Sequence, residues 1–156
     1  MLFVLLACSD SFAQNPAEIK AAEQVVRDFF EAFHRQDSVA LRNLAHPAIV
    51  MQSVGANAAG ETKLSTLAYG NFLKSIISIP SNTKFEEKLH SFEVQVNGPL
   101  AHVVTQYSFY LNNNLSHCGV NAFTLVKEER DWKITHLVDT RNKENCMPKD
   151  NLLIRD

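Results

Sequence analysis

The sequence predicts an α+β domain in which three N-terminal helices pack on an antiparallel sheet, and two observations carry this prediction. In the first half of the chain the apolar residues recur at the spacing of amphipathic helices, whereas from Phe85 onward they alternate as they do in strands. A chain of 156 residues also fits one domain with a single core. We therefore expect one domain over residues 14–156, with residues 1–13 as a separate segment.

The first thirteen residues have the features of a signal sequence remnant. Leu2–Ala7 is a short apolar run, and Ser11 and Ala13 are small residues at the −3 and −1 positions of a signal-peptidase site. The segment Leu5-Leu-Ala-Cys8 also resembles a lipobox, in which case Cys8 would carry a lipid anchor. An uncleaved core strand is the third reading. Either kind of signal predicts an exported protein, periplasmic or secreted.

The charge balance excludes some classes of partner. The chain has 15 Lys and Arg against 17 Asp and Glu, so its formal net charge is −2, and it contains no basic run. Nothing in it therefore indicates binding to nucleic acid or to an anionic membrane surface. The sequence also lacks Cys-x-x-Cys and His-x-x-x-His spacings, so we expect no metal and no cofactor.

Two cysteines remain in the predicted mature domain, Cys118 and Cys146. In an exported protein such a pair is expected to form a disulfide. Residues 142–145 would have to turn back to bring the two sulfur atoms together. Two free buried thiols and a metal site are the alternative readings.

The first long helix is predicted from about Pro16 to about Arg35, with Pro16 in its first turn. Its apolar stripe consists of Ile19, Ala22, Val26, Phe29, Phe30 and Phe33. Asp37 or Ser38 can cap a second, short helix that runs through Leu44.

A strand and a third helix follow. The apolar run 48–54 predicts a short strand, and the small residues of 55–63 predict a loop. Ser65 or Thr66 is expected to begin the third helix, which ends before Pro80. The apolar residues of this helix are Leu67, Phe72, Leu73, Ile76 and Ile77.

Three turns predict the register of the sheet. Asn97-Gly98 is a two-residue hairpin turn, a second turn is centred on Asn113, and a third lies between Glu129 and Arg130. The opposed pairs that follow are Val96–Pro99, Val94–Ala101, Phe92–Val103, Phe109–His117, Tyr107–Gly119, Thr105–Asn121, Lys127–Trp132, Leu125–Ile134 and Phe123–His136. Because directly opposed residues share a face of the sheet, the three registers agree on one inner face, which we expect to pack on the first helix.

The inner face is apolar at one end and polar at the other. Its polar side chains are His90, Thr105, Tyr107, Asn121 and, one row away, His136. Gly119 leaves a gap opposite Tyr107. Since a buried polar group without a partner costs roughly 1–3 kcal/mol, this cluster predicts either a ligand site or mutual hydrogen bonding.

Asp139 and Arg141 have two possible positions. Strict alternation from Trp132 places both side chains on the outer face of the sheet, where they would form a solvated pair. A β-bulge near His136-Leu137 would instead turn Asp139 and Arg141 inward and bring Asp139 close to Asn121.

The order of elements resembles the nuclear-transport-factor-2-like superfamily, which includes the SnoaL-like polyketide cyclases and ketosteroid isomerase. The segments that carry the resemblance are Phe29-Phe-Glu-Ala-Phe-His-Arg-Gln-Asp37, Leu44-Ala-His-Pro47, Gly119-Val-Asn-Ala-Phe123, Trp132-Lys-Ile134, Asp139-Thr-Arg141 and Cys146. It implies a curved, cone-shaped sheet with a ligand cavity beneath the helices and frequent homodimerisation through the sheet. No catalytic aspartate and tyrosine pair of the isomerase type can be transferred to this chain.

Two functional hypotheses follow. In the first, the domain is an exported module that binds a small, aromatic or cyclic molecule. In the second, it is an isomerase, cyclase or hydrolase in which His90 or Asp139 is the general base and Tyr107 donates a hydrogen bond to a developing oxyanion. A third reading is a vestigial pocket on a sheet that serves only to dimerise. An inward Asp139 would favour the enzyme.

Overall fold

The computed structural model describes residues 15–144 and 146, so the predictions for residues 1–13, with the anchor at Cys8, lie outside it. The described part contains three helices and six strands. The helices are α1 (Pro16–His34), α2 (Ser38–Leu44) and α3 (Tyr69–Ile77). The strands are β1 (Ala45–Ala56), β2 (Thr62–Leu67), β3 (Phe85–Asn97), β4 (Leu100–Leu111), β5 (Asn114–Glu128) and β6 (Asp131–Thr140).

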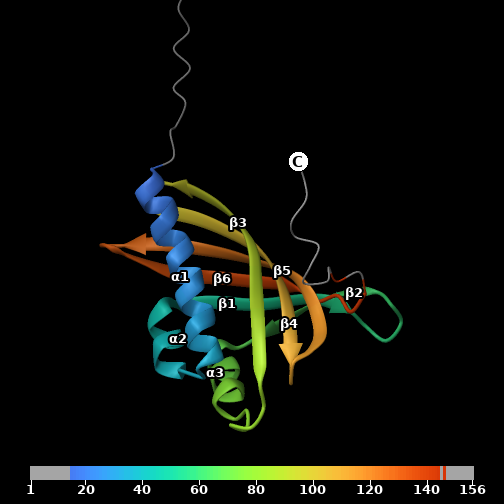
Figure 1. The fold of residues 1–156 in the computed structure, drawn as a ribbon. Helices are drawn as coiled ribbons and strands as arrows, with labels where there is room; N and C mark the ends of the chain where they lie inside the picture. The colour runs from blue at the N-terminus through green and yellow to red at the C-terminus, as the bar shows by residue number, and fades with distance from the viewer. Residues whose placement is uncertain (1–14, 145, 147–156) are drawn as a thin grey trace, which may run out of the picture.

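The six strands form one curved, open sheet in the order β2-β1-β6-β5-β4-β3. All neighbouring strands are antiparallel except β1 and β6, which run parallel. Helix α1 crosses one face of this sheet, and α2 and α3 lie near the C-terminal end of α1 (Figure 1). This arrangement confirms the predicted α+β class, with helices packed on a curved and mainly antiparallel sheet.

The two predicted N-terminal helices begin where their capping residues indicate. The side chain of Asn15 accepts a hydrogen bond from the Ala17 N–H, and Pro16 occupies the first turn of α1. Asp37 caps α2 by accepting a hydrogen bond of 2.9 Å from the N–H of Ala40. Both caps supply acceptors for N–H groups that have no partner within the helix.

Strand β2 was not predicted. Residues 62–67, expected to be the end of a loop and the start of a helix, pair with β1 from Ala56–Thr62 to Met51–Leu67. Every residue of β2 is exposed, and therefore no buried face requires apolar residues at every second position. The segment lacks the alternation that indicates a half-buried strand. Helix α3 consequently begins later than expected, at Tyr69.

The predicted register of the second hairpin is confirmed from Phe109–His117 to Thr105–Asn121, although the pairing shifts by one residue next to the turn. The register of the third hairpin is confirmed beside its turn, as in the pair Leu125–Ile134. The register of the first hairpin was wrong by two residues, since Asn97 pairs with Leu100 and the turn is Gly98-Pro99. A shift of two residues keeps each side chain on its predicted face, because the period of a strand is two.

The core lies between α1 and the inner face of the sheet. Val103, Phe123, Leu125 and Ile134 are buried there, as predicted, against α1 residues that include Phe30. Phe92 is half-buried, and the guanidinium of Arg27 lies 4.1 Å from the centre of its ring. No helix in the described part of the chain is both long and apolar enough to cross a membrane.

Candidate functional site

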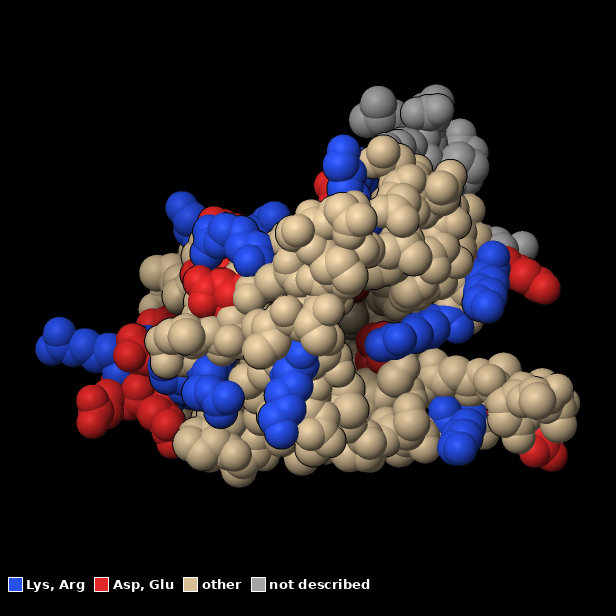
Figure 2. Space-filling view, turned by 90° about the horizontal axis from the view of Figure 1, so that it is seen from below, with Lys and Arg blue, Asp and Glu red and all other residues tan. Residues whose placement is uncertain are grey.

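A cavity of about 390 Å³ opens between the helices and the inner face of the sheet, close to the β1–β2 hairpin. Figure 2 shows the molecule hollowed on one side, with a basic side chain lying against an acidic one in the cleft. The cavity is lined by Phe29, Phe30, Phe33, Met51, Gln52, Ser53, Ser65, Thr66, Leu67, Phe72, Glu87, Asn121, Leu137, Asp139 and Arg141. It is therefore apolar on the helix side and polar at the sheet.

The apolar wall is mainly aromatic. Phe72 of α3 stacks on Phe29 and on Phe33 of α1, with ring centres 6.1 Å apart in both pairs and interplanar angles of 8° and 9°. Phe30 meets Phe123 of β5 edge to face at 6.0 Å. Parallel rings of this kind offer flat surfaces on which a planar or cyclic molecule can stack.

The polar end is formed by Glu87 of β3, Asn121 of β5, and Asp139 and Arg141 at the end of β6. The Asn121 carboxamide donates from Nδ2 to Glu87 Oε1 at 2.6 Å. Arg141 Nε donates to Asp139 Oδ2 at 2.8 Å. Asn121 and Asp139 are directly opposed across β5 and β6. Glu87 lies two rows away, opposite Phe109 of β4, and its side chain reaches Asn121 across the inner face.

A β-bulge in β6 brings Asp139 opposite Asn121 on the inner face. Leu125 pairs with Ile134, but Thr124 already pairs with His136, so Thr135 is an extra residue. Beyond it every side chain of β6 changes face, and Leu137 and Asp139 point inward. This is the bulged alternative considered from the sequence, and the outward position of Asp139 is excluded.

The same bulge overturns the predicted pairing of His136 with Phe123. His136 is opposed to Thr124 and lies on the outer face, where its Nε2 is 3.0 Å from Gln52 Oε1. It is not among the residues that line the cavity.

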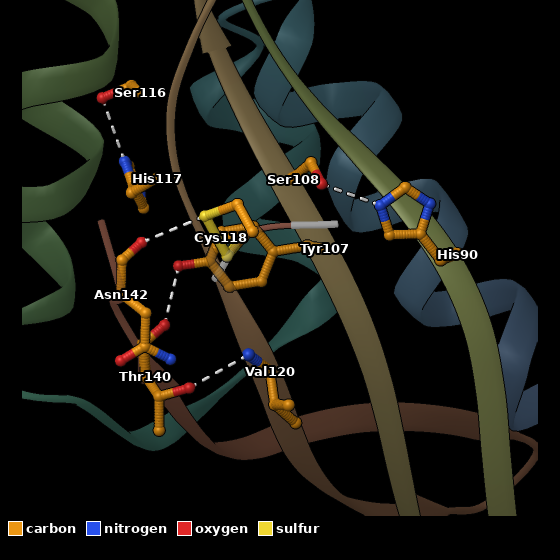
Figure 3. Close-up of a disulfide and its surroundings, with 10 residues drawn as sticks. His90, Tyr107, Ser108, Ser116, His117, Cys118, Val120, Thr140 and Asn142 are labelled. Atoms are coloured by element: carbon orange, nitrogen blue, oxygen red, sulfur yellow. Dashed lines mark hydrogen bonds between the residues drawn. A yellow bond between two sulfur atoms is a disulfide. The ribbon is translucent and has the colours of Figure 1, made fainter. Parts of the chain in front are cut away.

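A second bulge, in β3, turns Glu87 toward the cavity in place of His90. Leu89 pairs with Tyr107 and Phe92 with Thr105, so two residues of β3 lie opposite the single residue between them in β4. The predicted row that joined His90 to Thr105 was therefore wrong. Glu87 and Leu89 point inward, and His90 bonds Ser108 Oγ at 2.9 Å (Figure 3).

Sequence reasoning missed Glu87 although a signal was present. Phe85, Glu87 and Leu89 follow one alternation, and Phe92, Val94 and Val96 follow another. The apolar residues Leu89 and Phe92 are three positions apart, which strict alternation cannot place on one face. An extra residue between them resolves the conflict and turns Glu87 inward.

The gap predicted at Gly119 is filled by the backbone of Thr140. A Cβ atom at Gly119 would lie 1.9 Å from the Thr140 carbonyl oxygen. The Tyr107 hydroxyl donates to that same oxygen at 2.8 Å (Figure 3). Thr105 is fully buried and donates from Oγ1 to the Gln106 carbonyl. Tyr107 and Thr105 thus have partners within the protein and do not line the cavity.

The electrostatics of the polar end centre on Glu87. Burial, reinforced by the negative charge of Asp139, raises the pKa of its carboxyl to about 7, against the lowering effects of the Asn121 hydrogen bond and of Arg141. The backbone N–H of Glu87 donates to His34 Nε2 at 2.9 Å, and burial lowers the pKa of His34, so His34 is held neutral as an acceptor.

This arrangement can exchange a proton with a bound molecule. A carboxyl whose pKa lies near 7 is present in both its acid and base forms at neutral pH.

Among the described residues, no group of His, Cys, Asp and Glu side chains is arranged to hold a metal ion. The predicted disulfide is present and joins Cys118 to Cys146.

Comparisons with known proteins agree with the fold. A conserved protein from Planctomyces limnophilus matches with a TM-score of 0.68 and 15% identity, over 82% of this chain and 98% of that one. A proposed dehydratase of the nuclear-transport-factor-2-like family from Streptomyces avermitilis gives 0.62 and 20%, over 81% and 96%. A cystatin-like protein of unknown function from Nostoc punctiforme gives 0.65 and 8%, over 83% and 95%.

At these identities the structural likeness shows the fold alone. No curated protein matches the chain. The model of the SnoaL-like domain family matches residues 22–139, from within α1 to the penultimate residue of β6, and this range includes every residue of the polar end except Arg141. The chain therefore belongs to the SnoaL-like domain family, and its fold is that of nuclear-transport-factor-2-like proteins.

Proposed function

We propose that the cavity binds a small molecule with a cyclic, largely apolar body, and that Glu87 transfers a proton to or from that molecule. The observation that carries this proposal is a carboxyl with a near-neutral pKa at the polar end of an otherwise aromatic cavity.

Binding is supported by the size and lining of the cavity. A volume of about 390 Å³ lies in the range of small-molecule sites, roughly 300–1,000 Å³. The stacked rings of Phe29, Phe33 and Phe72 suit a cyclic body. Each carboxylate of the polar end has one oxygen in a hydrogen bond within the described part of the chain, which leaves the second oxygen of Glu87 and of Asp139 for a ligand.

Proton transfer is supported by the position of Glu87. As a base it can take a proton from carbon beside a carbonyl group, and as an acid it can protonate a departing hydroxyl. Negative charge that develops on the ligand can be met by the terminal nitrogens of Arg141, whose Nε alone bonds Asp139. The Tyr107 hydroxyl donates to Thr140, so it does not serve as the oxyanion donor considered from the sequence. These roles fit an isomerase or a dehydratase.

The proposal can be tested without knowledge of the natural substrate. We would follow exchange of the acidic C–H protons of 2-tetralone, a bicyclic ketone, in D2O by NMR between pH 5 and 9. Catalysed exchange should rise with pH around a midpoint near 7, and Glu87→Gln should slow it at least roughly 100-fold. Glu93→Gln is the matched control, since Glu93 is exposed on the outer face. Equal exchange by wild type and Glu87→Gln would contradict the role of Glu87.

A binding module without catalysis is the second candidate. The observation that favours it is that no tyrosine hydroxyl lines the cavity among the described residues, so Arg141 alone provides strong donors to an oxyanion. A co-purified molecule in native mass spectrometry, together with ketone exchange no faster than in buffer, would support this candidate over the enzyme.

We also propose that the protein is exported to an oxidising compartment. The Cys118–Cys146 disulfide supports this location, because structural disulfides persist outside the reducing cytosol. Fractionation of the native source followed by mass spectrometry of the N-terminus should find a chain that begins at Gln14 or at a lipidated Cys8. An intact leader in the cytosolic fraction would contradict export.

A further inference from the structure

Asp139 near the end of β6 and Arg141 just after it belong to the polar end, and regular pairing with β5 stops at Asp139. Asn121–Asp139 is the last pair of the β5–β6 ladder. Beyond it, Cys118 and Asn142 form an isolated bridge with two backbone hydrogen bonds of 2.9 and 2.8 Å. The segment that carries Arg141 is thus held between the end of the ladder and this bridge.

Thr140, between the last β5–β6 pair and the isolated bridge, is held by hydrogen bonds that involve side chains. Its carbonyl accepts from the Tyr107 hydroxyl at 2.8 Å, and its Oγ1 accepts from the Val120 N–H at 3.0 Å (Figure 3). Because Gly119 has no side chain, the Thr140 backbone can lie directly against β5. On its other side, Thr140 pairs with Val54 of β1. These contacts hold the residue between Asp139 and Arg141 in one position.

The disulfide closes this arrangement. Cys118 belongs to the isolated bridge, and its bond to Cys146 ties the segment after Asn142 back onto β5, with the two Cα atoms 5.5 Å apart. Both cysteines are only partly buried, so a small dithiol can reach the bond. The covalent link therefore lies beyond the last regular pair of β5 and β6, next to the residues that complete the site.

We propose that the Cys118–Cys146 disulfide keeps Asp139 and Arg141 in the cavity, so that the polar end of the site is assembled in the oxidised protein and taken apart on reduction. Reduction transfers two electrons and two protons from a dithiol to the protein. The S–S bond breaks, Cys118 and Cys146 become thiols, and the dithiol becomes a cyclic disulfide. Tyr107 is a positioning residue in this scheme, since it acts on the site through Thr140.

Release of the strand end would change the surroundings of Glu87. Burial raises the pKa of Glu87 most, and the charge of Asp139 raises it further, whereas Asn121 and Arg141 lower it. Withdrawal of Asp139 and Arg141 admits water to Glu87. It also removes the effect of Asp139, which raises the pKa more than Arg141 lowers it. The pKa of Glu87 should therefore fall from about 7 toward its ordinary value of 4.5.

The test is a ¹³C NMR titration of the Glu87 carboxyl in three forms of the protein: oxidised, reduced with dithiothreitol, and the Cys118→Ser/Cys146→Ser variant. The oxidised form should titrate with a midpoint near 7, and the other two at least one pH unit lower while their core amide signals stay native. The same midpoint in all three folded forms would overturn the proposal. A disulfide that only stabilises the global fold would leave the titration of Glu87 unchanged.

Tyr107→Phe tests the role of Thr140 separately. The variant keeps the buried ring and removes only the hydroxyl that bonds the Thr140 carbonyl. It should lower the pKa of Glu87 in the oxidised protein. The control Tyr110→Phe, which removes the hydroxyl from a ring beside Lys88, should leave the pKa of Glu87 unchanged. An unchanged pKa of Glu87 in Tyr107→Phe would remove Tyr107 from the mechanism.

The inference rests on the proposed function only in naming this cavity as the site. If reduction shifts the titration of Glu87 but no ketone exchange is found at any pH, the redox coupling stands and the catalytic proposal fails. If exchange depends on Glu87 but is the same in oxidised and reduced protein, the catalytic proposal stands and the redox coupling fails.

Discussion

Replacement of Glu87 by glutamine should stabilise the protein at alkaline pH. The pKa of Glu87 is about 7 in the folded state against an ordinary value of 4.5. At about 1.4 kcal/mol per pKa unit, this difference corresponds to about 3 kcal/mol. Glutamine keeps an oxygen that can accept the hydrogen bond from Asn121 and carries no charge to bury.

Proton linkage determines how the free energy of unfolding changes with pH. The folded protein holds the Glu87 proton more tightly than the unfolded chain, so this group destabilises the fold as pH rises from 4.5 to 7. Below pH 4.5 both states are protonated and the cost disappears, whereas above pH 7 the full cost applies. Glu87→Gln should therefore raise the free energy of unfolding by about 1 kcal/mol at pH 5 and by about 3 kcal/mol at pH 8.

Urea unfolding at the two pH values measures this difference. The single tryptophan, Trp132, is buried and provides the fluorescence signal. The exposed Glu93→Gln control should change stability by less than about 0.5 kcal/mol at either pH. A Glu87→Gln variant that gains the same stability at both pH values, or loses stability at pH 8, would refute the reasoning. Such a result would mean that ionised Glu87 is well solvated.

Three further predictions concern the strand end, the disulfide and assembly. Gly119→Ala should destabilise the fold by roughly 2–4 kcal/mol in urea unfolding, because its Cβ would collide with Thr140; Gly70→Ala, with open space around it, should not. The intact mass should be two hydrogens lighter before reduction than after it, and Cys118→Ser should remove about 3 kcal/mol of stability by freeing Cys146; alkylation of both thiols in the unreduced native protein would contradict this. We expect a homodimer formed through the sheet; sedimentation should then report twice the mass of the chain, and a monomer at high concentration would argue against it.

The sequence by itself determined the elements that depend on local chemistry. The start of α1 follows from a proline in its first turn, and the start of α2 follows from the capping residue Asp37. The burial of Phe123 and Leu125 follows from alternation around a turn. The inward and outward alternatives for Asp139 could also be enumerated. Strand β2 was missed because an exposed strand has no apolar periodicity to reveal it.

Only the tertiary structure decided which polar side chains reach the cavity. Two bulges, one beside His90 and one at Thr135, turn Glu87 and Asp139 inward and leave His90 and His136 outside the cavity. One extra residue in a strand reverses the face of every side chain beyond it, and its position depends on how a curved sheet fits against the helices packed on it. Local periodicity can therefore place a core row, whereas the composition of a site beyond a bulge depends on contacts between residues far apart in the chain.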